Sequence, residues 1–143
     1  ETELLSRANI KYERYANQAI IDSKTRSHRA RKQYLPSINK YLGKLANEIK
    51  DLKEAGIPVP PTTFDTAKKI SALLEEAGKA TDALDGLLEE AKNFHGRDLA
   101  IFSRDQLLPA RHALRSPIDQ LELLVSKEDW PVPSYGDLLF HII

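Results

Sequence analysis

The first helical stretch of this sequence is too long for a compact domain. Residues 2–55 have the pattern of one helical segment that contains a single proline, Pro36. At about 1.5 Å per residue, an unbroken helix of that length would span roughly 80 Å, which exceeds a compact fold of 143 residues. Either the helix breaks near Pro36 and folds back, giving four helices, or it continues and its first half projects. We favour the continuous helix and three helices overall.

An apolar stripe marks the second half of this segment. Gly56 and Pro58 then end the helix, because glycine accepts the left-handed conformation beyond a helix end and proline cannot continue the helix. Residues 56–61 form a stiff connector. The stripe follows alternating steps of three and four residues, as one face of a helix requires. It consists of Leu35, Ile38, Leu42, Leu45, Ile49 and Leu52.

The second helical segment covers about residues 62–94 and carries an unbroken heptad seam. Thr62 or Thr63 is the expected cap at its start, with Asp65 in the first turn. A seam with this spacing is suited to packing against another helix. Its members are Ile70, Leu74, Ala77, Thr81, Leu84, Leu88 and Ala91.

The third segment covers about residues 97–127 and completes the predicted fold. Pro109 and Pro117 lie inside it, and a proline inside a helix removes a hydrogen bond and bends the axis. The predicted fold is all-α: one domain, residues 1–143, forming an elongated antiparallel bundle of three long helices, or four if Pro36 breaks the first. The apolar face of the third segment consists of Leu107, Leu114, Ile118, Leu121 and Val125.

A polar run at residues 22–33 (DSKTRSHRARKQ) interrupts the apolar pattern, with Ala30 as its only apolar residue. A helix that is polar on every side has no face to bury, so we expect this run to be exposed or to rest on a partner. The run has no aromatic residues between its basic ones, which favours a solvated face or an acidic partner over nucleic acid. Its basic cluster is Lys24, Arg26, His28, Arg29, Arg31 and Lys32.

Charge and composition narrow the class of protein. The chain has 21 basic and 21 acidic residues, so no overall field attracts nucleic acid or an anionic membrane. Residues 1–55 carry a net charge of +5 and residues 62–93 a net charge of −3, which favours packing between them. The absence of cysteine and of any long apolar run favours a cytoplasmic protein. The chain has no methionine, even at position 1, so we expect a fragment of a longer protein.

The sequence contains no recognisable catalytic, cofactor or metal motif. No two of the four histidines are spaced as metal ligands on one helix face, and we expect surface or capping roles for His28, His95, His112 and His141. The adjacent glutamate pairs at residues 75–76 and 89–90 point in different directions on a helix and are expected to be solvated. No glycine-rich phosphate loop or nucleophile elbow is present.

The C-terminal tail, residues 128–143, is the remaining functional candidate. Two prolines exclude a regular helix at its start and stiffen it. The tail either folds back onto the end of the bundle or docks on another surface, and aromatic anchors often dominate such docking. The predicted docking residues are Trp130, Pro131, Pro133, Tyr135, Leu138, Leu139 and Phe140.

Several of these stretches resemble the type III glutamine synthetases. Residues 114–125 (LRSPIDQLELLV) and 130–140 (WPVPSYGDLLF) resemble the carboxy-terminal end of that family. Residues 6–13 (SRANIKYE) resemble the point where its catalytic domain meets its C-terminal helical domain, and residues 33–36 (QYLP) fall where the family has a Leu-Pro pair. The resemblance spans nearly the whole chain and is most specific in the tail.

The resemblance implies a C-terminal accessory domain of an ATP-dependent glutamate–ammonia ligase. The parent would use ATP with Mg²⁺ or Mn²⁺ in a large cytoplasmic ring-shaped oligomer, with its catalytic and metal residues upstream of this chain. The fragment alone would have no catalytic site and no cofactor, and its partners would be its own catalytic domain and neighbouring subunits. The alternative is a stand-alone helical interaction module that uses the seam at residues 70–91, and a weaker one is a nucleic-acid tether through the basic cluster.

Overall fold

The fold was analysed in a computed structural model that describes residues 2–131, with the side chains of residues 7–131. Every regular element in this part of the chain is helical, which confirms the predicted all-α bundle of three long helices. In chain order the elements are α1 (Thr2–Arg29), η1 (Ala30–Tyr34), α2 (Leu35–Glu54), α3 (Pro61–Glu90), η2 (Ala91–Asn93), α4 (Gly96–Phe102), η3 (Ser103–Leu107), α5 (Leu108–Leu124) and η4 (Lys127–Asp129).

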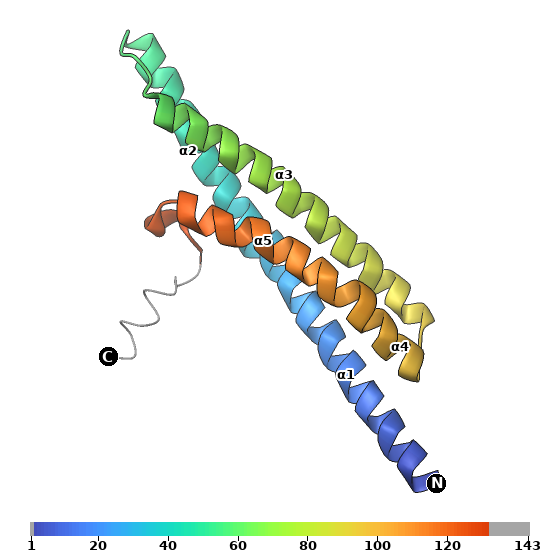
Figure 1. The fold of residues 1–143 in the computed structure, drawn as a ribbon. Helices are drawn as coiled ribbons and strands as arrows, with labels where there is room; N and C mark the ends of the chain where they lie inside the picture. The colour runs from blue at the N-terminus through green and yellow to red at the C-terminus, as the bar shows by residue number, and fades with distance from the viewer. Residues whose placement is uncertain (1, 132–143) are drawn as a thin grey trace, which may run out of the picture.

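The elements α1, η1 and α2 follow one another as a single long helix (Figure 1). Helix α3 runs back beside it, and α4, η3 and α5 form the third antiparallel member. The chain does not fold back at Pro36, so the three-helix arrangement holds and the four-helix alternative is wrong. The first part of α1 extends beyond the turn between α3 and α4 (Figure 1).

Two prolines are accommodated by π-helical turns directly before them. The backbone N–H of Leu35 donates to the carbonyl of Ala30, and that of Leu108 donates to the carbonyl of Ser103. Each bond spans five residues, which shifts the hydrogen-bond register where Pro36 or Pro109 would otherwise clash with the preceding turn. Both sites share the sequence Gln-x-Leu-Pro. The prolines therefore alter the helix locally without ending it.

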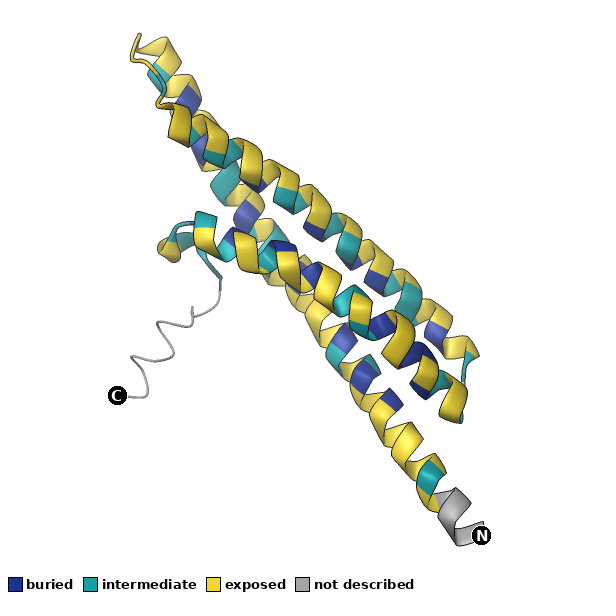
Figure 2. Cartoon of the chain, in the orientation of Figure 1, coloured by how far each residue is buried: buried dark blue, intermediate teal, exposed yellow. Residues whose placement is uncertain are grey.

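The core consists of two clusters along the bundle. One joins α1 and η1 to α3, α4, η3 and α5 and contains Leu84, Phe102 and Leu107. The other joins α2, α3 and α5 and contains Ile38 and Ile70. Figure 2 shows the buried residues as short bands that face the middle of the bundle, with exposed residues on the outer sides of the helices.

The heptad seam of α3 is buried inside this chain. Ile70, Ala77, Thr81 and Leu84 are fully buried, and Leu74 and Leu88 are half-buried against the same clusters. Because α3 packs along both α2 and α5, the seam has no free face for a partner helix. The alternative function that needed this seam at residues 70–91 is therefore wrong.

The connector between α2 and α3 begins as predicted and ends earlier than predicted. Gly56 has a φ of +73°, and the N–H of Ile57 donates to the carbonyl of Leu52 at 2.9 Å, which is the pattern of a Schellman helix end. Helix α3 begins at Pro61, and no side chain caps it. Proline suits the first helical position because its φ is already helical and its missing N–H would be unbonded there. The predicted cap at Thr62 or Thr63 is therefore wrong.

The polar run at residues 22–33 does have a buried face, contrary to the prediction. Ser23, Ser27 and Ala30 are all buried on the side of the helix that meets the rest of the bundle. The hydroxyl of Ser23 donates to the carbonyl of Ala19 at 2.7 Å, so it needs no outside partner. Small side chains with satisfied hydroxyls can thus form a packing face that a hydrophobicity pattern does not detect.

Candidate functional site

The titratable residues singled out in the sequence lie apart from one another in the structure. No set of three or more His, Asp or Glu residues within residues 2–131 could hold a metal ion. His28, His95 and His112 are exposed on separate elements, whereas His141 lies outside the described residues. Glu75 pairs with Lys79 at 3.2 Å on the same helix, so it belongs to a solvated face. The candidates for function are consequently surfaces.

The start of the predicted docking tail folds back onto the bundle. The rings of Trp130 and Tyr34 lie with their centroids 5.3 Å apart at an interplanar angle of 45°. Trp130 is half-buried and packs against the core cluster shared by α2, α3 and α5. Pro131 is also half-buried. The other predicted docking residues lie outside the described part of the chain, namely Pro133, Tyr135, Leu138, Leu139 and Phe140.

An ion pair fixes the turn that carries Trp130. The ammonium Nζ of Lys44 on α2 donates to a carboxylate oxygen of Asp129 at 2.7 Å. This hydrogen bond lowers the pKa of Asp129 and raises the pKa of Lys44. The pKa of Tyr34 is raised chiefly because burial disfavours the charged phenolate. In the described part of the tail, Asp129 and Trp130 therefore attach to the bundle by an ion pair and by ring and core packing.

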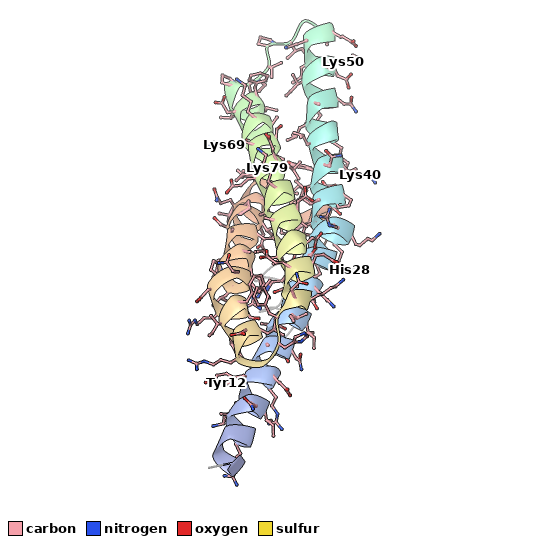
Figure 3. All side chains as sticks on the ribbon, turned by 90° about the vertical axis from the view of Figure 1, so that its right-hand side faces the viewer. Tyr12, His28, Lys40, Lys50, Lys69 and Lys79 are labelled. Atoms are coloured by element: carbon pink, nitrogen blue, oxygen red, sulfur yellow. The ribbon has the colours of Figure 1, made fainter. Side chains whose placement is uncertain are left out.

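The residues of the basic cluster have different neighbours in the structure. Arg31 donates from Nε to Asp85 at 2.8 Å and also pairs with Asp82 at 2.7 Å, both on α3. The buried hydroxyl of Ser27 donates to Asp85 as well. His28 lies on the outer surface of the long helix, as Figure 3 shows. Arg31 therefore pairs with acidic residues of α3 in the same chain, in line with the opposite net charges of residues 1–55 and 62–93.

An exposed apolar surface on α1 was missed by the sequence analysis. Ile10 and Ile21 are 45% and 56% exposed, and they lie eleven residues apart, which is about three helical turns. They therefore share a face, and at about 100° per residue it is opposite to the face of Ala16 and Ala19, which are buried. The spacing of the two isoleucines was the only available signal. Figure 3 shows Tyr12 on the stretch where α1 leaves the bundle.

None of the helices within residues 2–131 combines the length and the apolar character that crossing a bilayer requires. What the described residues define is an elongated three-helix bundle with one long helix that projects.

Comparison with known proteins connects this bundle to one enzyme family. A family model described as the glutamine synthetase C-terminal domain matches residues 1–53, which cover α1, η1 and most of α2. The chain is also 25% identical over 150 aligned positions to a glutamine synthetase from Bacteroides fragilis, an alignment that covers 98% of this chain. A type-3 glutamine synthetase from Dictyostelium discoideum is 30% identical over 77 positions, or 53% of this chain.

These matches confirm the resemblance predicted from the sequence: the chain is similar to the C-terminal domain of glutamine synthetases. The chain covers only 20% of the length of the Bacteroides protein and 10% of that of the Dictyostelium protein. No solved structure matches the chain.

Proposed function

We propose that this chain is the C-terminal helical part of a type-3 glutamine synthetase and that its role there is structural. The parent would be a cytoplasmic, oligomeric glutamate–ammonia ligase that uses ATP and Mg²⁺ or Mn²⁺, and the chemistry would take place in the part of the enzyme that precedes this domain. The observation that carries the proposal is the match of residues 1–53 to the family's C-terminal domain, supported by an alignment over nearly the whole chain.

Two surfaces of the chain are suited to docking on the catalytic part or on neighbouring subunits. One is the outward face of α1, where Ile10 and Ile21 expose apolar area that the bundle does not cover. The other is the tail, whose first anchor, Trp130, is only half-buried on Tyr34. Covering these side chains in an assembly would contribute at about 25 cal/mol per Å² of apolar surface, before the cost of ordering.

The first experiment compares the full reading frame with the isolated 143-residue chain. ATP- and glutamate-dependent consumption of ammonia is measured for both with Mg²⁺ or Mn²⁺. The expected result is activity in the full protein and none in the isolated chain. A full protein without this activity would contradict the assignment to the enzyme, whatever the isolated chain does.

The second experiment tests the structural role in the full protein. Replacing Ile10 and Ile21 together with serine, or Trp130 with alanine, should reduce the size of the assembly in light scattering and leave the KM for glutamate nearly unchanged. Lys11→Ser is the matched control, because Lys11 is exposed on the same helix and lies about 100° around it from Ile10, outside the face of Ile10 and Ile21. An unchanged assembly with a raised KM would contradict a role in docking and would instead place these residues near the substrate.

A further inference from the structure

Four arginine side chains converge on one small cavity between α1 and α5. The cavity has a volume of about 140 Å³ and is partly enclosed. Arg26 and Arg29 reach it from the end of α1, and Arg111 and Arg115 reach it from α5. These residues are far apart in the sequence, so only the packing of α1 beside the parallel α5 places them around one cavity.

The charges around this cavity are not balanced within the described residues. Arg111 lies 3.6 Å from a carboxylate oxygen of Asp22, and Arg115 donates to Asp119 at 3.3 Å. Within residues 7–131, no acidic side chain lies within ion-pair distance of Arg26 or Arg29. Four arginines line the cavity, whereas the acidic residues near it are Asp22, Asp119 and Glu122, so positive charges outnumber negative ones there.

The walls of the cavity add an apolar floor and one hydroxyl group. Ala30, Leu114 and Ile118 form the apolar lining, and the first two are buried in the core. Tyr34 completes the wall, and its ring is held by Trp130. A phenol hydroxyl can donate a hydrogen bond to an anion, which would add to the charged donors of the arginines.

We propose that this cavity, which we call the arginine pocket, binds the phosphate group of a small molecule. Guanidinium groups bind phosphate oxygens with two parallel N–H donors, and several can share the oxygens of one tetrahedral group. A phosphate near pH 7 carries a charge of about −1.5 to −2, which is opposite in sign to the net charge of the residues around the cavity. The inference concerns the chain's own residues and does not depend on the activity of the parent enzyme.

The test is a calorimetric titration of the 143-residue chain with inorganic phosphate in a chloride buffer of low ionic strength. The expected result is saturable binding of one phosphate per chain. Arg29→Gln should weaken the affinity by about tenfold or more, because a hydrogen bond between charged groups is lost. Arg26→Gln should act in the same direction. Arg97→Gln is the matched control, since Arg97 is an exposed arginine outside the pocket and should leave the affinity unchanged.

Thermal unfolding separates binding from folding. Arg26 and Arg29 are exposed, so their variants should melt at the temperature of the unchanged chain when phosphate is absent. Phosphate should raise the melting temperature of the unchanged chain and of Arg97→Gln, and much less that of Arg29→Gln. Absence of saturable binding at low salt, or equal loss in Arg97→Gln and Arg29→Gln, would overturn the proposal.

Two further ligands identify the source of the phosphate group. If AMP binds as tightly as inorganic phosphate, with the same dependence on Arg29, the natural ligand is a phosphate ester; binding of inorganic phosphate alone would indicate the free ion. Succinate also carries two negative charges, but they are farther apart than the charged oxygens of one phosphate group. If it binds more tightly than phosphate, the pocket is a dicarboxylate site and the phosphate assignment is wrong.

Discussion

The two halves of the long first helix pack in different ways. Helix α1 and the η1 turn after it meet the bundle mostly through small side chains, Ala16, Ala19, Ser23, Ser27 and Ala30, whereas α2 meets α3 through larger ones such as Ile38 and Leu45. Small residues let helix backbones approach closely, and large residues interlock at a greater distance. The packing of α2 therefore requires large side chains at the contact, whereas the packing of α1 requires small ones.

The largest expected effect is the loss of a large side chain from α2. Ile38 is fully buried, so Ile38→Ala removes apolar contacts and leaves a cavity, which should lower the free energy of unfolding by about 2–5 kcal/mol. The measurement is chemical denaturation followed by circular dichroism. Ile21→Ala on α1 is the matched control: Ile21 is 56% exposed, so its loss should change stability by no more than about 0.5 kcal/mol.

Adding a large side chain to the packing face of α1 should also destabilise the fold. Ser23 is fully buried, so Ser23→Leu places a large side chain where the neighbouring helices leave no room and should cost about 1–3 kcal/mol of stability. Ser23→Ala keeps the small volume and should cost much less, because the hydroxyl bonds only to its own helix. If Ser23→Leu were as stable as Ser23→Ala, the close packing of α1 would be refuted. The same denaturation experiment distinguishes the two results.

A smaller effect of opposite sign is expected at Ser103, which is in η3 beside α1. Its hydroxyl is buried and has no hydrogen-bond partner among the described residues. Ser103→Ala removes an unsatisfied polar group, so stability should stay unchanged or rise by up to about 1 kcal/mol. A loss of more than about 1 kcal/mol in chemical denaturation would show that the hydroxyl has a partner.

The smallest effect concerns pH and the attachment of the tail. The folded pKa of Asp129 lies below its unfolded value, so its ion pair with Lys44 stabilises the fold above the unfolded pKa and is lost as the pH falls through the folded one. As the pH falls below the ordinary carboxyl pKa of about 3.9, the emission of Trp130 should therefore shift to longer wavelength as the ring leaves Tyr34. Asp129→Asn should show the shifted emission already at pH 7, and an unchanged spectrum in this variant would contradict the link between the ion pair and Trp130.

Bulky apolar patterns were the reliable part of the sequence analysis. The stripe on α2, the seam on α3 and the apolar face of the third helix are buried or half-buried at the positions predicted, because large apolar side chains on one face of a helix are driven out of water together. The polar run on α1 was misjudged because serine and alanine carry little hydrophobic signal, although Ser23 and Ala30 pack as closely as any core residue. The arginine pocket was not predictable, because Arg26 and Arg111 are 85 positions apart.

The sequence by itself determined that the protein is helical, where the apolar stripes run, that the first long helix ends at Gly56, and which family the chain resembles. These properties depend on local spacing and on residue type, which the order of amino acids states directly. Only the tertiary structure decided that the first helix continues through Pro36 by a π-helical turn and that the α3 seam is used within the chain. It also decided which basic residues meet acidic ones and which meet each other. The physical reason is that these outcomes depend on distances between helices, and such distances follow from how all three pack at once.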